Sequence, residues 1–255
     1  MAYDYIYGVD VWEGSLDIDE SILKAAGIDF AVIRLNDMRG GHKVDKNFAR
    51  QWLEADQFLR WPYFVYNPWV NGKANFEFMA RYMPDCGAVS ADIEVRYEGY
   101  SPVTYAKEVD IFLKLTAAEW NLNIYTGPWF LKYLSKWPSN YEYWWAQYPY
   151  SLYPDVKLRS TWSTVMKKIR DIKFFPPSAS PGPCRLRQVT ADRYILPGCC
   201  DRPIDINVWN GTLQELKDWV GGKNSNGSSV PVGEEWAVSI DAWARGMGYA
   251  GPRPA

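Results

Sequence analysis

The sequence predicts an α/β fold: a modified β/α barrel of the triosephosphate-isomerase (TIM) type, with eight strands and with helices mainly after the first five. Three observations lead to this prediction. Apolar, strand-like runs recur along the chain, helical stretches follow the first five of them, and 255 residues are an ordinary length for one such barrel. A hydrophobic content of 47% with 23% charged residues is typical of a chain that folds around a core.

The predicted strands are short runs of mostly apolar residues. The fourth is the most continuous of them, which is typical of a strand buried on both faces. In chain order the eight strands are Tyr5–Val11, Phe30–Leu35, Pro62–Tyr66, residues 88–95, Asn123–Thr126, Tyr143–Tyr148, Leu186–Thr190 and Ile204–Val208.

The predicted helices show apolar residues at helical spacing or clear end signals. Gly27 closes the first, and Ser101 with Pro102 begins the fourth as cap and first-turn residue. The helices are about Asp19–Ala26, Asp45–Leu59, Ala74–Met83, Ser101–Trp120 and Gly127–Ser135. Beyond them the sequence predicts irregular connections, and segment 150–183 is the most irregular.

The barrel is expected to occupy residues 1–220. Residues 221–233 are rich in Gly, Ser and Asn, which is typical of a flexible linker. Residues 234–255 carry apolar side chains on one helical stripe, but they are too few for a core of their own. We expect this short C-terminal helical tail to pack on the barrel or on a partner rather than to form a separate binding module.

Two acids at the end of the fourth strand are the main functional signal. Side chains alternate along a strand, so Asp92 and Glu94 point to the same side, about 7 Å apart. Two carboxyl groups at the end of an apolar strand repel each other and lose hydration, so one of them is expected to keep its proton at neutral pH. A protonated acid beside an ionised one is what cleavage of a glycosidic bond requires. The alternative is a strand end that carries two solvated acids.

Composition argues against several other classes of protein. The single histidine, His42, argues against zinc peptidases and against hydrolases that pair Ser or Cys with a His base. A net charge of −2 gives no electrostatic case for binding nucleic acid. No run approaches the ~18 apolar residues of a membrane span. No metal or organic cofactor is expected, because paired carboxylates need none.

Aromatic residues are unusually abundant, with 14 Trp and 18 Tyr. Flat rings with one polar edge are good platforms for sugars, although many of these residues must fill the core.

Three of the four cysteines cluster late in the chain. Cys184 is expected either to pair with Cys199 or Cys200 or to remain reduced. The N-terminus lacks a basic segment followed by an apolar one, so no signal peptide is expected.

The order and spacing of several motifs resemble those of glycoside hydrolase family 25, the lysozymes that cleave bacterial peptidoglycan. The resemblance spans about residues 5–215. The fourth strand contains Ala-Asp-Ile-Glu (91–94), which matches the family's Asp-x-Glu signature. The other matching motifs are Tyr-Gly-Val-Asp-Val (7–11), Ala-Ala-Gly-Ile-Asp-Phe-Ala-Val-Ile-Arg (25–34), Ile-Tyr-Thr (124–126), Trp-Trp-Ala-Gln-Tyr (144–148) and Asp-Ile-Asn-Val-Trp-Asn-Gly (205–211).

The resemblance implies roles for particular residues. Glu94 is the expected general acid, and Asp92 stabilises the positive charge or orients the N-acetyl group of the substrate. Asp10 and Asp205 complete an acidic ring at the mouth of the barrel. The implied substrate-binding residues are Tyr63, Tyr125, Trp144, Tyr148, Gln188 and Asn207. Trp69, Tyr97, Tyr100 and Trp209 extend the groove or serve in packing.

The family retains anomeric configuration, so two routes fit the Asp-x-Glu pair. Either Asp92 attacks the anomeric carbon, or the substrate acetamide attacks with support from Asp92. We favour the assisted route, because both sugars of the polymer carry an acetamide. Arg187 departs from the family, which usually has Trp at that position.

The implied partner is the glycan strand of bacterial peptidoglycan, and no oligomeric state is indicated. The implied place of action is the cell wall, reached by a phage endolysin that a holin releases or by a secreted enzyme whose leader was removed. Two alternatives remain. One is a catalytically silent barrel that binds wall glycans or serves as a virion component. The other is a chitinase-like hydrolase, although Ser90 occupies the position where that family carries a further Asp.

Overall fold

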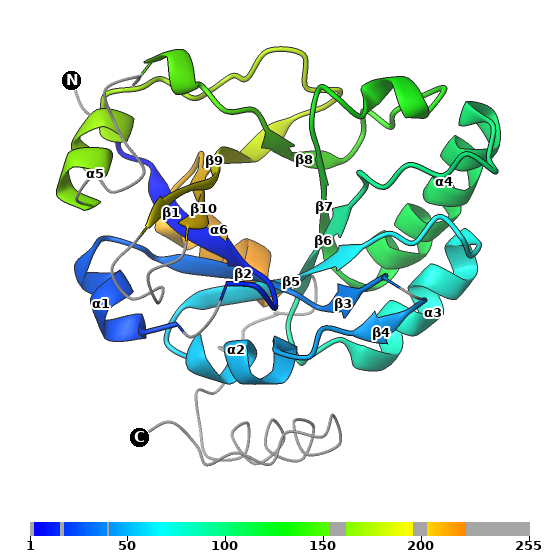
Figure 1. The fold of residues 1–255 in the computed structure, drawn as a ribbon, viewed down its shortest axis with the longest axis horizontal. Helices are drawn as coiled ribbons and strands as arrows, with labels where there is room; N and C mark the ends of the chain where they lie inside the picture. The colour runs from blue at the N-terminus through cyan, green and yellow to red at the C-terminus, as the bar shows by residue number, and fades with distance from the viewer. Residues whose placement is uncertain (1–2, 16–17, 40, 153–161, 196–202, 223–255) are drawn as a thin grey trace.

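The structure is a computed structural model, and it describes residues 3–15, 18–39, 41–152, 162–195 and 203–222. Eight strands close into a barrel in the order β1-β10-β9-β8-β7-β6-β5-β2 (Figure 1). The strands are β1 (Ile6–Val11), β2 (Phe30–Arg34), β5 (Leu59–Val65), β6 (Ala88–Asp92), β7 (Asn121–Thr126), β8 (Glu142–Ala146), β9 (Cys184–Ile195) and β10 (Pro203–Trp209). A small hairpin of β3 (Asn36–Asp37) and β4 (Lys43–Val44) lies outside the barrel sheet. The predicted α/β barrel of eight strands is therefore confirmed.

Strand β10 gives the barrel its mixed character. It pairs antiparallel with both β9 and β1, whereas every other neighbouring pair in the barrel is parallel. The reason lies in the connection between β9 and β10, residues 196–202. A parallel crossover needs a dozen or more residues, so this connection can only return the chain in the opposite direction.

The helices that follow the strands have clear sequence causes. Helix α1 (Glu20–Ala25) is capped by Asp19, and α4 (Pro102–Glu119) by Ser101, each of which accepts a backbone N–H bond through its side chain. Gly27, with φ of 86°, ends the first helical segment as predicted. The remaining helices are α2 (Phe48–Glu54), α3 (Gly72–Tyr82), α5 (Trp162–Arg170) and α6 (Leu213–Gly221). No helix within the described ranges is both long and apolar enough to cross a membrane.

Three helix predictions need correction. The helix expected at 127–135 is a single 3₁₀ turn at Leu131–Tyr133, because Gly127 and Pro128 hold a turn at its start. Part of the segment expected to be irregular forms α5, whose Val165, Met166 and Ile169 pack into the outer core. Helix α6 was not predicted at all. The expected linker and tail lie, apart from 221–222, outside the described residues.

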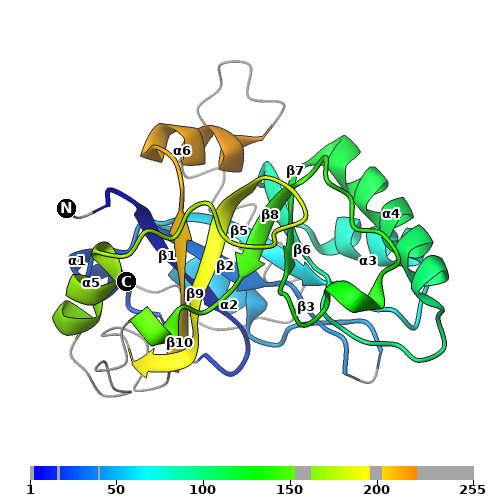
Figure 2. The ribbon, with the colours of Figure 1, turned by 90° about the horizontal axis from the view of Figure 1, so that it is seen from above.

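Helix α6 covers the end of the barrel at which the parallel strands begin (Figure 2). Trp219 contacts the interior rings of Trp61 and Trp209, with ring centroids 5.2 and 5.7 Å apart. The end of the helix lies so close to Gly87 that a Cβ there would be 2.2 Å from the backbone nitrogen of Gly222. Helix α6 therefore covers the interior rings at this end of the barrel.

Candidate active site

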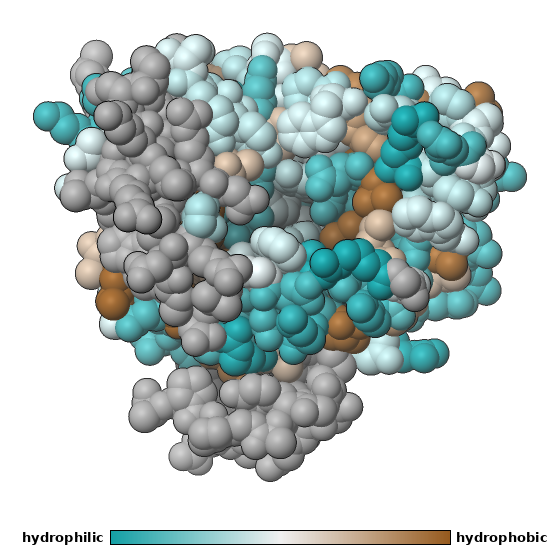
Figure 3. Space-filling model, viewed as in Figure 1, coloured by the Kyte–Doolittle hydropathy of each residue, from teal (hydrophilic) through white to brown (hydrophobic). Residues whose placement is uncertain are grey.

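The four predicted acids come together at the open end of the barrel. Asp92 is the last residue of β6, which ends before the predicted residue 95, and Glu94 lies two residues beyond Asp92, just outside the strand. Asp10 on β1 and Asp205 on β10 are direct partners across the two strands. All four line a cavity of about 290 Å³. Figure 3 views this face and shows hydrophilic side chains around a hollow near its middle.

Gln188 connects this cluster. Its amide nitrogen donates to Asp10 Oδ2 at 2.9 Å and to Asp205 Oδ2 at 3.1 Å. Its amide oxygen accepts from the hydroxyls of Tyr125 at 3.0 Å and Tyr148 at 2.8 Å. Both N–H groups and both lone pairs of the buried amide are thereby used, which sets its orientation. Gln188, predicted to bind substrate, instead hydrogen-bonds four side chains of the site.

Asn207 supports Asp10 in the same way. Its side-chain nitrogen donates to Asp10 Oδ2 at 2.7 Å, and its oxygen accepts from Trp144 Nε1 at 2.8 Å. The indole N–H can only donate, so it determines which end of the Asn207 amide faces the acid. Two amide donors therefore converge on a single oxygen of Asp10, an arrangement that suits an ionised carboxylate.

Both Asp92 and Glu94 have raised pKa values. Burial is the main cause of the raised pKa of Asp92, followed by the charges of Glu94 and Asp10, while Arg34 lowers it. Burial, then the charge of Asp10, raises the pKa of Glu94 to about 7. Asp92 Oδ1 is also buried without a hydrogen-bond partner among the described residues. One proton shared by the pair at neutral pH is the expected result.

The aromatic candidates occupy different positions. Tyr63 and Tyr125 line the cavity, each 8% exposed, and both contact Trp144, with ring centroids 5.9 and 4.6 Å away. Trp144 is 1% exposed, so it forms the floor of the cavity rather than an open platform. Tyr148 lies outside the lining and reaches the acids through Gln188.

The four aromatic residues that were expected either to extend the groove or to serve in packing differ in position. Trp209 is buried against α6 and serves in packing. Trp69 is 54% exposed, and its ring contacts Tyr97, which in turn contacts Tyr100. None of these four lines the cavity that holds the acids.

A polar part of the cavity wall, on β2 and the β3 region, was missed by sequence reasoning. Arg34, Asn36, Asp37 and Arg39 all line the cavity. Arg34 pairs with Asp45 at 2.7 Å, and its Nη2 is buried without a hydrogen-bond partner in the described part of the chain. Only Arg34 had a sequence signal, because it ends one of the family-like motifs. The others belong to the β3 region, where the pattern predicts nothing.

Of the two states left open for Cys184, the structure has the reduced one: Cys184 is a free thiol that donates to the Leu186 carbonyl at 3.2 Å. Its proposed partners Cys199 and Cys200 lie outside the described residues. Within the described ranges, no group of three or more His, Cys, Asp or Glu side chains is arranged to hold a metal ion.

The Gln188 network predicts an unequal effect of two substitutions on stability. Gln188→Leu leaves two phenols and two carboxylates without this partner, so we expect the free energy of unfolding to fall by about 2–4 kcal/mol. Tyr148→Phe removes one hydrogen bond and should cost about 1 kcal/mol. Urea unfolding at neutral pH measures both. Equal losses would contradict a central role for Gln188.

Comparisons with known proteins agree with this architecture at the level of the fold. The sequence matches no family model, and no curated protein matches it. A bacterial lysozyme from Streptomyces coelicolor aligns with a TM-score of 0.63 at 19% identity, over 83% of this chain and 94% of that one. A family 25 glycosyl hydrolase from Bacillus anthracis aligns with a TM-score of 0.64 at 20% identity, over 86% and 96%.

A phage protein aligns in the same way. The catalytic domain of an endolysin from bacteriophage P40 of Listeria monocytogenes gives a TM-score of 0.58 at 17% identity, over 87% of this chain and 100% of that one. The resemblance drawn from the motifs is confirmed by these matches in overall structure. The chain has the fold of the family 25 glycosyl hydrolases, a modified TIM barrel.

Proposed function

We propose that the protein is a muramidase that hydrolyses the β-1,4 bond between N-acetylmuramic acid and N-acetylglucosamine in bacterial peptidoglycan, with retention of configuration. The observation that carries the proposal is the pair Asp92 and Glu94, a buried and a half-buried carboxyl group with raised pKa values at the open end of a barrel of this fold. The proposed place of action is the bacterial cell wall.

Glu94 is the proposed general acid and base. Its proton passes to the glycosidic oxygen as the bond from that oxygen to the anomeric carbon breaks. In the assisted route the acetamide oxygen of the same sugar bonds to the anomeric carbon. This bond closes a five-membered ring on the sugar. Water then attacks the anomeric carbon and opens that ring, and Glu94 takes a proton from the water. A pKa of about 7 suits a group that must both give and take a proton near neutral pH.

Asp92 is the proposed partner of the acetamide. Its Oδ1, buried and without a partner among the described residues, suits the acetamide N–H of the substrate. Such a bond favours the ionised form of Asp92, as does Arg34. Ionisation of Asp92 leaves the shared proton on Glu94, where the first step needs it. Binding of the substrate therefore prepares the acid.

Asp10 and Asp205 are proposed to act through charge. Their shared contact with Gln188 holds both carboxyl groups beside the cavity. Negative charge there favours the positive charge that develops on the sugar ring in the transition state. Tyr63 and Tyr125 are proposed to flank the sugar, with Trp144 beneath them.

The pKa of Glu94 predicts the alkaline side of the pH profile. The acid must be protonated in the free enzyme, so kcat/KM for peptidoglycan is expected to fall as pH rises through about 7. The midpoint belongs to the coupled pair with Asp92 rather than to one residue. Initial rates across the neutral range and well to either side of it measure the midpoint. A kcat/KM that stays constant far into the alkaline range would contradict Glu94 as the acid.

The release of reducing ends from purified peptidoglycan by the wild-type protein tests the proposal, with mass analysis of the fragments. Fragments that end in reducing muramic acid are the expected result. Fragments that end in reducing glucosamine would instead identify a glucosaminidase. No release, with binding to the polymer retained, would identify a silent glycan-binding barrel. Chitin serves as a second substrate, which tests the chitinase-like alternative. Against that alternative, Ser90 stands where the chitinase family carries an Asp, and its hydroxyl accepts a hydrogen bond from Trp61 Nε1.

A further inference from the structure

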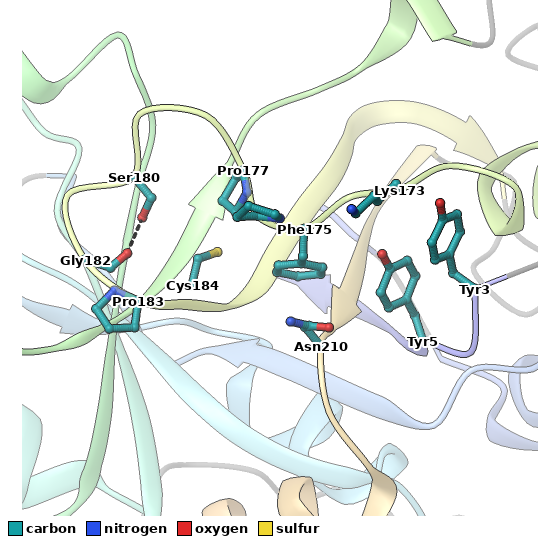
Figure 4. Close-up of a pocket in the computed structure, with 11 residues that line it drawn as sticks. Tyr3, Tyr5, Lys173, Phe175, Pro177, Ser180, Gly182, Pro183, Cys184 and Asn210 are labelled. Carbon is teal, nitrogen blue, oxygen red and sulfur yellow. Dashed lines mark hydrogen bonds between the residues drawn. The ribbon is translucent and has the colours of Figure 1, made fainter.

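A second cavity, of about 650 Å³, opens at the other end of the barrel from the acids. Figure 4 shows residues that line it. It lies between Tyr5, which precedes β1, Cys184 at the start of β9, and Asn210, which follows β10. Strand β1 runs from this end towards Asp10. Tyr5 and Asp10 are five residues apart, so the two cavities are separated by about 17 Å along the strand. No step of the proposed reaction uses this second cavity.

Aromatic rings form one side of the cavity. Tyr3 and Tyr5 stack with ring centroids 5.6 Å apart and planes 9° from parallel, and Tyr3 is 38% exposed. Phe175 meets Tyr5 edge to face at 5.6 Å. Figure 4 shows these three rings side by side along the cavity. Tyr3 is the exposed ring of the three, whereas Tyr5 is half-buried and Phe175 is buried.

Backbone contacts hold these rings in place. The Tyr3 N–H donates to the Arg170 carbonyl at 2.9 Å, and the Tyr5 hydroxyl accepts from the Phe174 N–H at 3.2 Å. The rings are therefore ordered before any ligand arrives, which lowers the entropic cost of binding.

Polar groups line the rest of the cavity. Lys173 reaches it without an ion-pair partner among the described residues, and the Asn210 amide faces it beside Phe175. Because the Lys173 ammonium has no ion-pair partner in the described part of the chain and lies beside stacked rings, the cavity favours a ligand with both a flat apolar face and a carboxylate.

We propose that this cavity is a second binding site for peptidoglycan, remote from the acids, that holds an acetamido sugar against Tyr3 and a lactyl or peptide carboxylate against Lys173. The inference rests on the proposed function. Peptidoglycan carries both groups at every repeat. A polymer that is held at two sites stays at a high local concentration near the acids even when either site alone is weak.

Binding to insoluble polymers tests the proposal without the need for turnover. In a Glu94→Gln background, Tyr3→Ala is expected to weaken binding to purified peptidoglycan and to chitin about fivefold to tenfold, because one stacked ring is lost. Lys173→Ala is expected to weaken binding to peptidoglycan by a similar factor. It should leave binding to chitin unchanged, because chitin lacks carboxylates. Ile22→Ala, at an exposed apolar residue of α1, is the matched control.

The same substitutions in the active protein separate the two sites. Hydrolysis of insoluble peptidoglycan should slow in Tyr3→Ala and Lys173→Ala, while kcat/KM for a soluble tetrasaccharide from peptidoglycan stays unchanged. Unchanged polymer binding in both variants would overturn the second site but leave the muramidase proposal standing. If binding depends on Tyr3 and Lys173 but the wild-type protein hydrolyses neither substrate, the second site would stand and the muramidase proposal would fall. Equal losses on polymer and tetrasaccharide would also overturn the second site.

Discussion

Glu94→Gln is expected to lower peptidoglycan hydrolysis by about 10³-fold, because the glutamine amide has no acidic proton to give to the leaving oxygen. Gln has nearly the same shape and can still accept hydrogen bonds, so binding to the polymer should remain within about twofold. The alkaline decline of the pH profile should disappear together with the group whose pKa is about 7. Reducing-end release and a polymer sedimentation assay measure the two effects.

A matched control lies four residues further along. Glu98 has a side chain that is 79% exposed and pairs with Arg96 on the surface. Glu98→Gln makes the same chemical change outside the cavity and should keep wild-type activity. If Glu94→Gln retained more than a tenth of that activity, another residue would have to supply the proton.

The acid pair could be predicted from sequence because it depends only on local geometry. Alternation along a strand directs Asp92 and Glu94 to the same side, and an apolar run makes the strand a buried one. Asp10 and Asp205 came instead from the resemblance to the family, and alternation along their strands agrees with it. The Gln188 network could not be derived in the same way, because its bonds join residues up to 178 positions apart.

The direction of β10 depends on a connection rather than on a pattern within the strand. A run such as Ile204–Val208 has the same appearance in a parallel and in an antiparallel sheet. In the structure, residues 196–202 connect β9 to β10, and this connection is too short for a parallel crossover. The predicted strands, however, leave 13 residues (191–203) between them, enough for a crossover. Only the extension of β9 to Ile195, which the sequence pattern did not indicate, shortens the connection.

Helix α6 had a readable signal that was missed. Thr212 and Glu215 form a capping box, in which each side chain accepts a bond from the other residue's backbone N–H. Leu216 and Trp219, at helical spacing, face the barrel.

Arg187, which stands where the family usually has Trp, is explained by its packing. Its guanidinium donates to the Phe174 and Gln147 carbonyls and lies over the Phe174 ring at 5.6 Å, positions that sequence alone does not reveal.

Asp92→Asn is expected to lower hydrolysis by about 10²- to 10³-fold and yet to stabilise the protein at neutral pH. The sign follows from the raised pKa. Between its ordinary value near 3.8 and the higher value in the folded protein, Asp92 holds more protons when folded, so stability falls as pH rises through this window. An asparagine side chain cannot ionise, so the variant escapes this loss. Its melting temperature should exceed that of the wild type at neutral pH, and the two should converge as pH falls towards 3.8.

Asp85→Asn is the control for this stability effect, because Asp85 is exposed just before the same strand. It should not raise the melting temperature at neutral pH. An unchanged or lower melting temperature for Asp92→Asn would mean that the carboxylate is well stabilised in the fold. The buried, unpartnered Oδ1 would then need a different explanation.

Azide separates the two retaining routes in an Asp92→Ala variant. If Asp92 is the nucleophile, its removal opens space on the face that it attacks, and azide should restore turnover and give a glycosyl azide of inverted configuration. In the assisted route the acetamide already occupies that face, so azide should restore nothing. We expect no rescue, because Asp92 favours its protonated form until an amide N–H binds to it, and a protonated carboxyl group is a poor nucleophile. Its position suits a group that orients the acetamide and leaves the attack to the substrate.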